Sequence, residues 1–131
     1  HENFEGIDET IALSSMYAAN HLGARVVATL TQTGKTALWM SRISSNIAIF
    51  AMSDNYKTLK KVTIYRGVYP CYIDKTSADD WNDVNSHVIE NLEDRAEVTN
   101  GDIVIVTKGM HKDKSGGTNL MKILRVGDGN Y

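Results

Sequence analysis

Cysteine and proline are nearly absent from this sequence. Cys71 is the single cysteine and Pro70 the single proline among 131 residues, so no disulfide can form within the chain. A protein without disulfides suits a reducing compartment, and we expect a cytoplasmic location. The sequence also lacks any apolar run near the roughly 20 residues that a membrane-spanning helix needs. Its opening residues do not resemble a signal peptide, so we expect no membrane partner.

A strong charge of one sign is missing as well. Fourteen Lys and Arg residues stand against sixteen Asp and Glu residues, which gives a formal net charge of −2. The overall field is therefore weakly negative and does not attract a nucleic-acid backbone. We expect no nucleic-acid partner, and any anion site in this protein must be built from local groups.

The size of the chain fits one domain. Of its 131 residues, 42% are hydrophobic, which is enough for one continuous core but not for two. We expect a single domain over residues 1–131. Because the chain begins at His1 and not at a methionine, we also expect it to be a piece of a longer protein.

Strand-like apolar runs alternate with helical patterns along the chain. The spacing predicts helices at 8–21, from the turn at 31–34 to about 43, after 54, and from 77, with Asp8 and Asp54 as caps. It predicts strands at 25–30, 47–52, 68–73, 102–107 and 119–126. The alternation indicates parallel strands, but the last connection is too short for a crossover, so the last strand must be antiparallel. The predicted fold is α/β: a three-layer α/β/α sandwich around a five-stranded mixed sheet with four parallel strands.

The first candidate site is the loop that follows the first predicted strand. In open parallel sheets, ligands bind at the carboxyl ends of the strands, where loops lead into helices. Hydroxyl groups, a glycine, main-chain N–H groups and one lysine together suit a phosphate. An ordinary capped turn explains the same residues equally well. A nucleotide P-loop is excluded, because Thr29 stands where that motif needs glycine. The candidate residues are Thr31, Gln32, Thr33, Gly34, Lys35 and Thr36.

The second candidate is the connection between the last two predicted strands, at residues 109–118. It is rich in glycine and basic residues, and it could close over an anion held by the first loop. A solvated surface hairpin is the alternative, and the residues alone favour it. The candidate residues are Lys112, Lys114, Ser115, Gly116 and Gly117.

The remaining reactive residue types indicate no catalytic or metal site. Cys71 lies in an apolar strand and is expected to be a buried small hydrophobe. The four histidines lack metal-ligand spacing, and neither a nucleophile nor a carboxylate pair accompanies Lys108 and His111. Trp81 fits a core position, although its place near a strand end would also let it flank a ligand. We therefore expect no catalytic residue, no metal ligand and no cofactor in this domain.

Several segments together resemble one known family, the pyruvate kinases. The segments follow that family's order and approximate spacing in its C-terminal α/β domain, and together they cover almost the whole chain. They are IDETIALSSMYAAN (7–20), TQTGKTA (31–37), SRISSNIAIFAMS (41–53), YRGVYP (65–70), GDIVIVT (101–107) and SGGTN (115–119). The chain therefore resembles the regulatory domain of a pyruvate kinase.

The resemblance implies a tetrameric glycolytic enzyme that transfers a phosphoryl group from phosphoenolpyruvate to ADP with magnesium and potassium. Its catalytic barrel, which would be the partner domain in the same chain, is missing from this sequence, so the piece alone is expected to be inactive. The resemblance also implies that loop 31–36 holds a phosphate of an activating ligand while the loop at 109–118 closes over it. In such enzymes the first helix and the last strand pack between subunits, which agrees with the apolar residues around residues 11–19.

The sequence departs from the family in ways that bear on the ligand. Members activated by fructose bisphosphate carry a tryptophan, which Trp81 matches, and an arginine seven residues later, where this chain has Val88. The SRISS and IFAMS segments are most similar to a bacterial branch that responds to AMP or to monophosphorylated sugars. The expected effector is therefore a sugar phosphate or AMP.

Two other classes stay open at this point. One is a stand-alone flavodoxin-like protein or enzyme that binds a phosphorylated ligand. The other is a signalling receiver domain that would pair Asp54 with Lys108. Receivers need an acidic pair after their first strand, where this chain has Thr31, Gln32 and Thr33.

Overall fold

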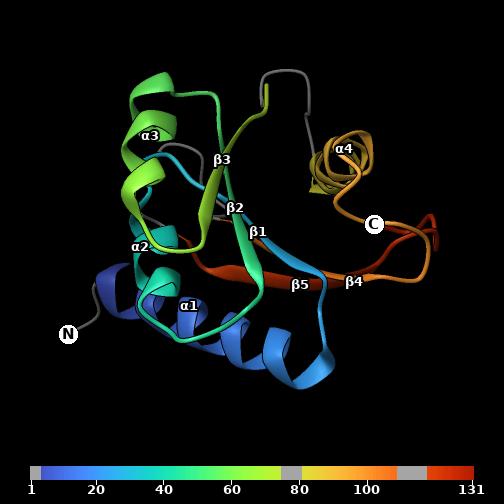
Figure 1. Cartoon of the computed structure of the whole chain (residues 1–131), viewed down its shortest axis with the longest axis horizontal. Helices are drawn as coiled ribbons and strands as arrows, with labels where there is room; N and C mark the ends of the chain where they lie inside the picture. Colours follow the sequence, from blue (N-terminus) through green and yellow to red (C-terminus); the bar gives the residue numbers. More distant parts are fainter. Residues whose placement is uncertain (1–3, 75–80, 109–117) are drawn as a thin grey trace.

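The computed structural model describes residues 4–74, 81–108 and 118–131. The strands of this part form one sheet in the order β3-β2-β1-β4-β5, and Figure 1 shows their arrangement. They are β1 (Val26–Leu30), β2 (Ala48–Ser53), β3 (Val68–Tyr72), β4 (Ile103–Lys108) and β5 (Leu120–Arg125).

The strand pairing confirms the predicted sheet. β1 pairs in parallel with β2 on one side and with β4 on the other, and β2 pairs in parallel with β3. β5 runs antiparallel to β4, with Ile103 opposite Arg125 and Lys108 opposite Leu120. The central strand β1 is buried at all of its positions, as expected for a strand covered on both faces.

Helices cover both faces of the sheet, which confirms the three layers. α4 supplies Val88, Ile89 and Leu92 to the core on one face. The other face is covered by α1, α2 and the turn after α3, which supply Met16, Met40 and others. Figure 1 shows α4 on the opposite side of the sheet from α1 and α2. The helices are α1 (Phe4–Leu22), α2 (Lys35–Ser41), α3 (Tyr56–Lys61) with the 3₁₀ turn η1 (Val62–Ile64), and α4 (Trp81–Asp94).

Two predicted helix caps are wrong. Asp8 lies inside α1 and is only 1% exposed, because the helix already includes Phe4 and continues through Gly6 despite the low helix propensity of glycine. α3 is capped by Asn55 and not by Asp54. Asn55 has extended backbone angles, and its side chain accepts hydrogen bonds from the N–H groups of Lys57 and Thr58, as an N-cap requires. The predicted start of the fourth helix at Ser77 lies outside the described residues.

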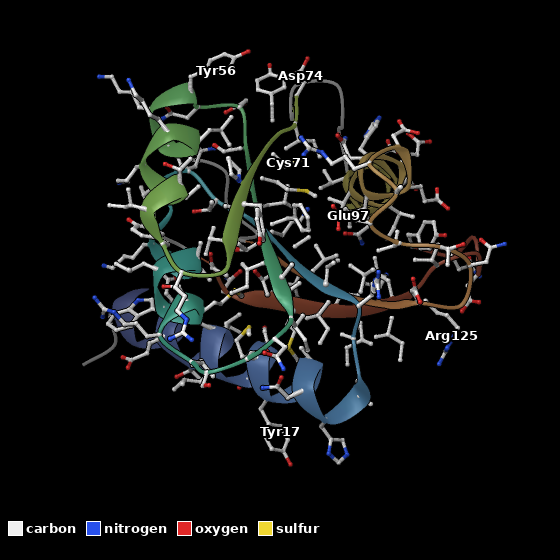
Figure 2. The ribbon with its side chains drawn as sticks, in the orientation of Figure 1. Tyr17, Tyr56, Cys71, Asp74, Glu97 and Arg125 are labelled. Carbon is white, nitrogen blue, oxygen red and sulfur yellow. The ribbon has the colours of Figure 1, made fainter. Side chains whose placement is uncertain are left out.

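The first helix buries one face and exposes a second apolar one. Ala12, Met16 and Ala19 are fully buried against the sheet. On the outer side, Leu13 is 52% and Tyr17 71% exposed, and Figure 2 shows Tyr17 pointing away from the rest of the domain. This agrees with the apolar surface that the sequence places around this helix. None of the helices in the described ranges is long and apolar enough to cross a membrane.

Truncating the buried face of α1 should cost much more stability than truncating its outer face. Met16→Ala removes a fully buried side chain and should lower the free energy of unfolding by about 2–5 kcal/mol. Leu13→Ala, three residues away on the outer face, is the matched control and should cost less than about 1 kcal/mol. Urea unfolding followed by circular dichroism measures both values. Equal losses would contradict the described orientation of α1.

Candidate functional site

The loop 31–36 lies at the carboxyl edge of the sheet, between β1 and α2. Its first residue, Thr31, is buried, and its N–H group donates a hydrogen bond of 3.0 Å to the main-chain oxygen of Met52 at the end of β2. The ladder between β1 and β2 therefore extends one residue into the loop. This contact fixes where the loop leaves the sheet.

Hydroxyl groups inside the loop hold its turn. The N–H group of Gly34 donates to Oγ1 of Thr31 at 2.8 Å, and the N–H group of Lys35 donates to Oγ1 of Thr33 at 3.3 Å. These are the local side-chain to main-chain bonds that favour turns in threonine-containing sequences. The loop thus keeps its shape through its own threonines, and the main-chain N–H groups of Thr31, Gly34 and Lys35 already have acceptors.

Gly34 lets the loop approach α3 closely. Its backbone is left-handed, with φ of 84°, and a Cβ atom there would lie 2.9 Å from Cγ1 of Val62 and 3.6 Å from Cγ2 of Thr58. Glycine alone adopts this conformation without strain and leaves this space free. Thr58 also donates a hydrogen bond from its hydroxyl group to the main-chain oxygen of Gln32. α3 and η1 are therefore packed directly against the loop.

The structure brings the two candidate loops together at one point. Thr118, which follows the segment 109–117, is buried and accepts a hydrogen bond of 2.8 Å from the hydroxyl group of Thr36. The N–H group of Asn119 donates to the main-chain oxygen of Lys108 at 3.2 Å, which joins the two strands beside it. Thr118 thus lies next to the start of α2. Its predicted residues Lys112, Lys114, Ser115, Gly116 and Gly117 lie outside the described residues.

Two positions on helix α4, Trp81 and Val88, bear on the candidate site. Trp81 is the first residue of α4, and its side chain lies outside the described part. Val88 is fully buried in the core together with Leu92. Val88 therefore occupies a packing position in this chain.

Cys71 is a core residue, as predicted. It is 1% exposed, and Figure 2 shows its sulfur on the side of β3 that faces α4. Burial raises the pKa of the Cys71 thiol, and the nearby Arg95 guanidinium offsets part of this effect. A thiol with a raised pKa stays protonated near neutral pH and is a poor nucleophile. Within the described ranges, no three His, Cys, Asp or Glu residues lie close enough together to hold a metal ion.

Sequence reasoning missed the part of the site that comes from α3. Thr58 and Val62 carry no recognisable motif, and their role depends on the contact with Gly34 and Gln32. The available signal was topological: β1 and β2 are parallel neighbours, so the elements that follow them must lie side by side.

Gly34→Ala should destabilise the domain for two separable reasons. An alanine at φ of 84° is strained, and its Cβ would collide with Val62. Gly23→Ala is the matched control, because Gly23 has φ of 68° but open space around its Cβ position. We expect a loss of about 1–2 kcal/mol for the control from the backbone alone and a larger loss for Gly34→Ala. Val62 is itself fully buried, so Val62→Ala has its own cost; if the contact is as described, that cost should be smaller in the Gly34→Ala background than in the original chain, and equal costs in both backgrounds would contradict it.

Comparison with known proteins identifies the family. The family model described as pyruvate kinase, alpha/beta domain, matches residues 9–124. The chain is 48% identical over 124 residues to a pyruvate kinase of Buchnera aphidicola subsp. Schizaphis graminum and 44% identical over 124 residues to pyruvate kinase II of Salmonella typhimurium. Each alignment covers 94% of this chain but 25% of the relative. A pyruvate kinase of Staphylococcus haemolyticus is 28% identical over 118 residues, which are 20% of its length.

The chain thus spans about a quarter of the length of the Buchnera and Salmonella pyruvate kinases that it matches. The matched region includes β1 to β4, α2, α3, α4, loop 31–36 and all of β5 except its last residue, Arg125. The predicted resemblance is confirmed at the level of the domain: this chain belongs to the pyruvate kinase alpha/beta domain family.

Proposed function

We propose that this chain is the regulatory domain of a pyruvate kinase and that it binds a phosphorylated effector at loop 31–36. The observation that carries this proposal is the buried hydrogen bond between Thr36 and Thr118. It ties the start of α2 to the residue where the glycine-rich second loop ends. A ligand held by loop 31–36 would therefore lie next to the segment that is expected to close over it.

The chemistry of the loop suits a phosphate group. Threonine hydroxyls both donate and accept hydrogen bonds, and Lys35 adds a positive charge. Because the whole chain has a formal net charge of −2, the attraction must come from such local groups. The hydrogen bond from the N–H group of Lys35 to Oγ1 of Thr33 is 3.3 Å long and is the longer of the two bonds inside the turn. A bound phosphate could replace this bond and accept a hydrogen bond from the hydroxyl group of Thr33 or from the N–H group of Lys35.

The expected effector carries one phosphate. A second phosphate would need its own cation, and Val88 is buried in the core where fructose-bisphosphate-responsive relatives are expected to carry arginine. A monophosphorylated sugar or AMP fits this arrangement better than a bisphosphate. Trp81 begins α4 and would flank the ligand in this proposal, as would the lysines of the second loop.

The parent protein would transfer a phosphoryl group from phosphoenolpyruvate to ADP in glycolysis, in the cytoplasm. The named relatives support this, since they are pyruvate kinases about four times as long as the aligned region. The reaction needs magnesium and potassium, which the catalytic barrel outside this sequence would bind.

Regulation would work through a difference in affinity. An effector activates only if it binds better to the active arrangement of the whole enzyme than to the inactive one. Contacts between subunits provide a route for this coupling, and the parent is expected to be a homotetramer. Leu13 and Tyr17 on α1 and Ile123 on the edge strand β5 are exposed apolar side chains that suit such a contact.

Binding should raise the thermal stability of the chain. The ligands to test at millimolar concentration are fructose 1,6-bisphosphate, ribose 5-phosphate, AMP and inorganic phosphate. A ligand at about 100 times its dissociation constant adds roughly 2.7 kcal/mol, or several degrees in the unfolding midpoint. Lys35→Ala should abolish the shift, while Lys60→Ala on the far side of α3 should leave it unchanged. If none of the ligands shifts the midpoint, the effector site is not present in this chain.

The chain alone should have no pyruvate kinase activity. Catalysis is assigned to the barrel, so a lactate-dehydrogenase-coupled assay with phosphoenolpyruvate, ADP, magnesium and potassium should give no rate above the buffer control. A preparation of the corresponding full-length enzyme serves as the positive control. Turnover that grows with the concentration of this chain would contradict the assignment and favour a stand-alone enzyme.

A further inference from the structure

Helix α3 is a basic element packed against the candidate loop. Its sequence, YKTLKK, contains three lysines and no acidic residue. Two contacts dock it on the loop: the hydroxyl group of Thr58 donates to the main-chain oxygen of Gln32, and Val62 fills the space beside Gly34. A positive helix therefore lies directly beside the loop of a chain whose formal net charge is −2.

The three lysines do not face the same way. An α-helix turns about 100° per residue, so Lys61 lies about 60° from Thr58 around the helix axis and Lys60 about 160° from it. Thr58 faces the loop, as its bond to Gln32 shows. Lys61 is thus on the loop side of α3, and Lys60 is on the opposite side.

An atomic contact agrees with this geometry. A Cβ atom built at Gly34 would lie 3.8 Å from Cε of Lys61. Cε carries the ammonium group, so the charge of Lys61 lies one covalent bond beyond an atom that approaches the centre of loop 31–36. The side chain is exposed and keeps the rotamer freedom to turn toward a bound anion.

We infer that Lys61 is a further ligand-binding residue of this site, which contributes a second cation from α3 to the phosphate held at loop 31–36. This inference rests on the proposed function, because it assigns Lys61 to the same anion. The site would then include residues from the β1–α2 loop and from α3, the helix that follows the neighbouring strand β2. Lys35 follows Gly34 within the loop, and Lys61 approaches Gly34 from the neighbouring helix α3.

The position of Lys61 also predicts what class of ligand gains from it. A compact dianion such as a phosphate monoester interacts with two cations, whereas a carboxylate monoanion of similar size gains less. The interaction occurs at the protein surface, so it weakens as salt is added, since the screening length is about 10 Å at 0.1 M ionic strength.

Calorimetric titration with ribose 5-phosphate and with inorganic phosphate, at low and at moderate salt, tests the inference. Lys61→Met keeps the aliphatic contact with Gly34 and removes the charge. We expect the dissociation constant of the Lys61→Met variant to be about tenfold higher than that of the original chain, which corresponds to a loss of about 1.4 kcal/mol of binding free energy. Lys60→Met is the matched control, one residue away on the opposite side of α3, and should change the constant by less than about twofold. Lys61→Arg should retain most of the affinity, which separates charge from any loss of packing.

The outcomes separate this inference from the proposed function. If the original chain binds and Lys61→Met binds as Lys60→Met does, Lys61 is not part of the site, while the proposed function stands. If Lys61→Met and Lys61→Arg lose affinity equally, the effect comes from packing against Gly34, and the assigned charge is wrong. If the original chain binds neither probe, both the proposed function and the inference fail.

Discussion

The parallel pairing of β1 with β2 and β4 is the constraint on which the rest of the structure depends. It places the ends of these strands at one edge of the sheet, so the connections that follow them meet there. The pairing even continues past the strands, since the N–H group of Thr31 donates to Met52. A buried hydroxyl bond of 2.8 Å between Thr107 and Thr29 joins β4 to β1 near the same edge. The candidate site is thus a consequence of strand order.

Much of the fold was predictable because its signals are local or follow from simple topology. Strands rich in valine and isoleucine, and the short last connection, were enough to predict the mixed sheet that the structure has. The caps were not predictable in the same way. Asp54 and Asn55 are adjacent and equally suitable by type, and only the backbone angles at Asn55 decide between them. Asp8 was misassigned because a good capping residue also occurs inside a long helix.

The site was predictable only in part for a related reason. Loop 31–36 could be found because its residues are consecutive, and the hydrogen bond from Thr36 to Thr118 joins the start of α2 to the residue that follows segment 109–117. The contribution of α3 could not be read from composition, since a lysine on a short helix is usually solvated. It depends on Gly34, which adopts a left-handed backbone and has no Cβ atom that would collide with Val62 and separate the loop from Lys61.

The central claim is that one phosphorylated ligand contacts the β1–α2 loop, α3 and the end of the second loop at the same time. Backbone NMR of the ¹⁵N-labelled chain during titration with ribose 5-phosphate tests it directly, because each amide reports separately. The account predicts saturable shifts concentrated at residues 33–36, at Lys61 and at Thr118, with α1 unaffected. Shifts spread along the exposed face of α1, or no saturable shifts at loop 31–36, would contradict it.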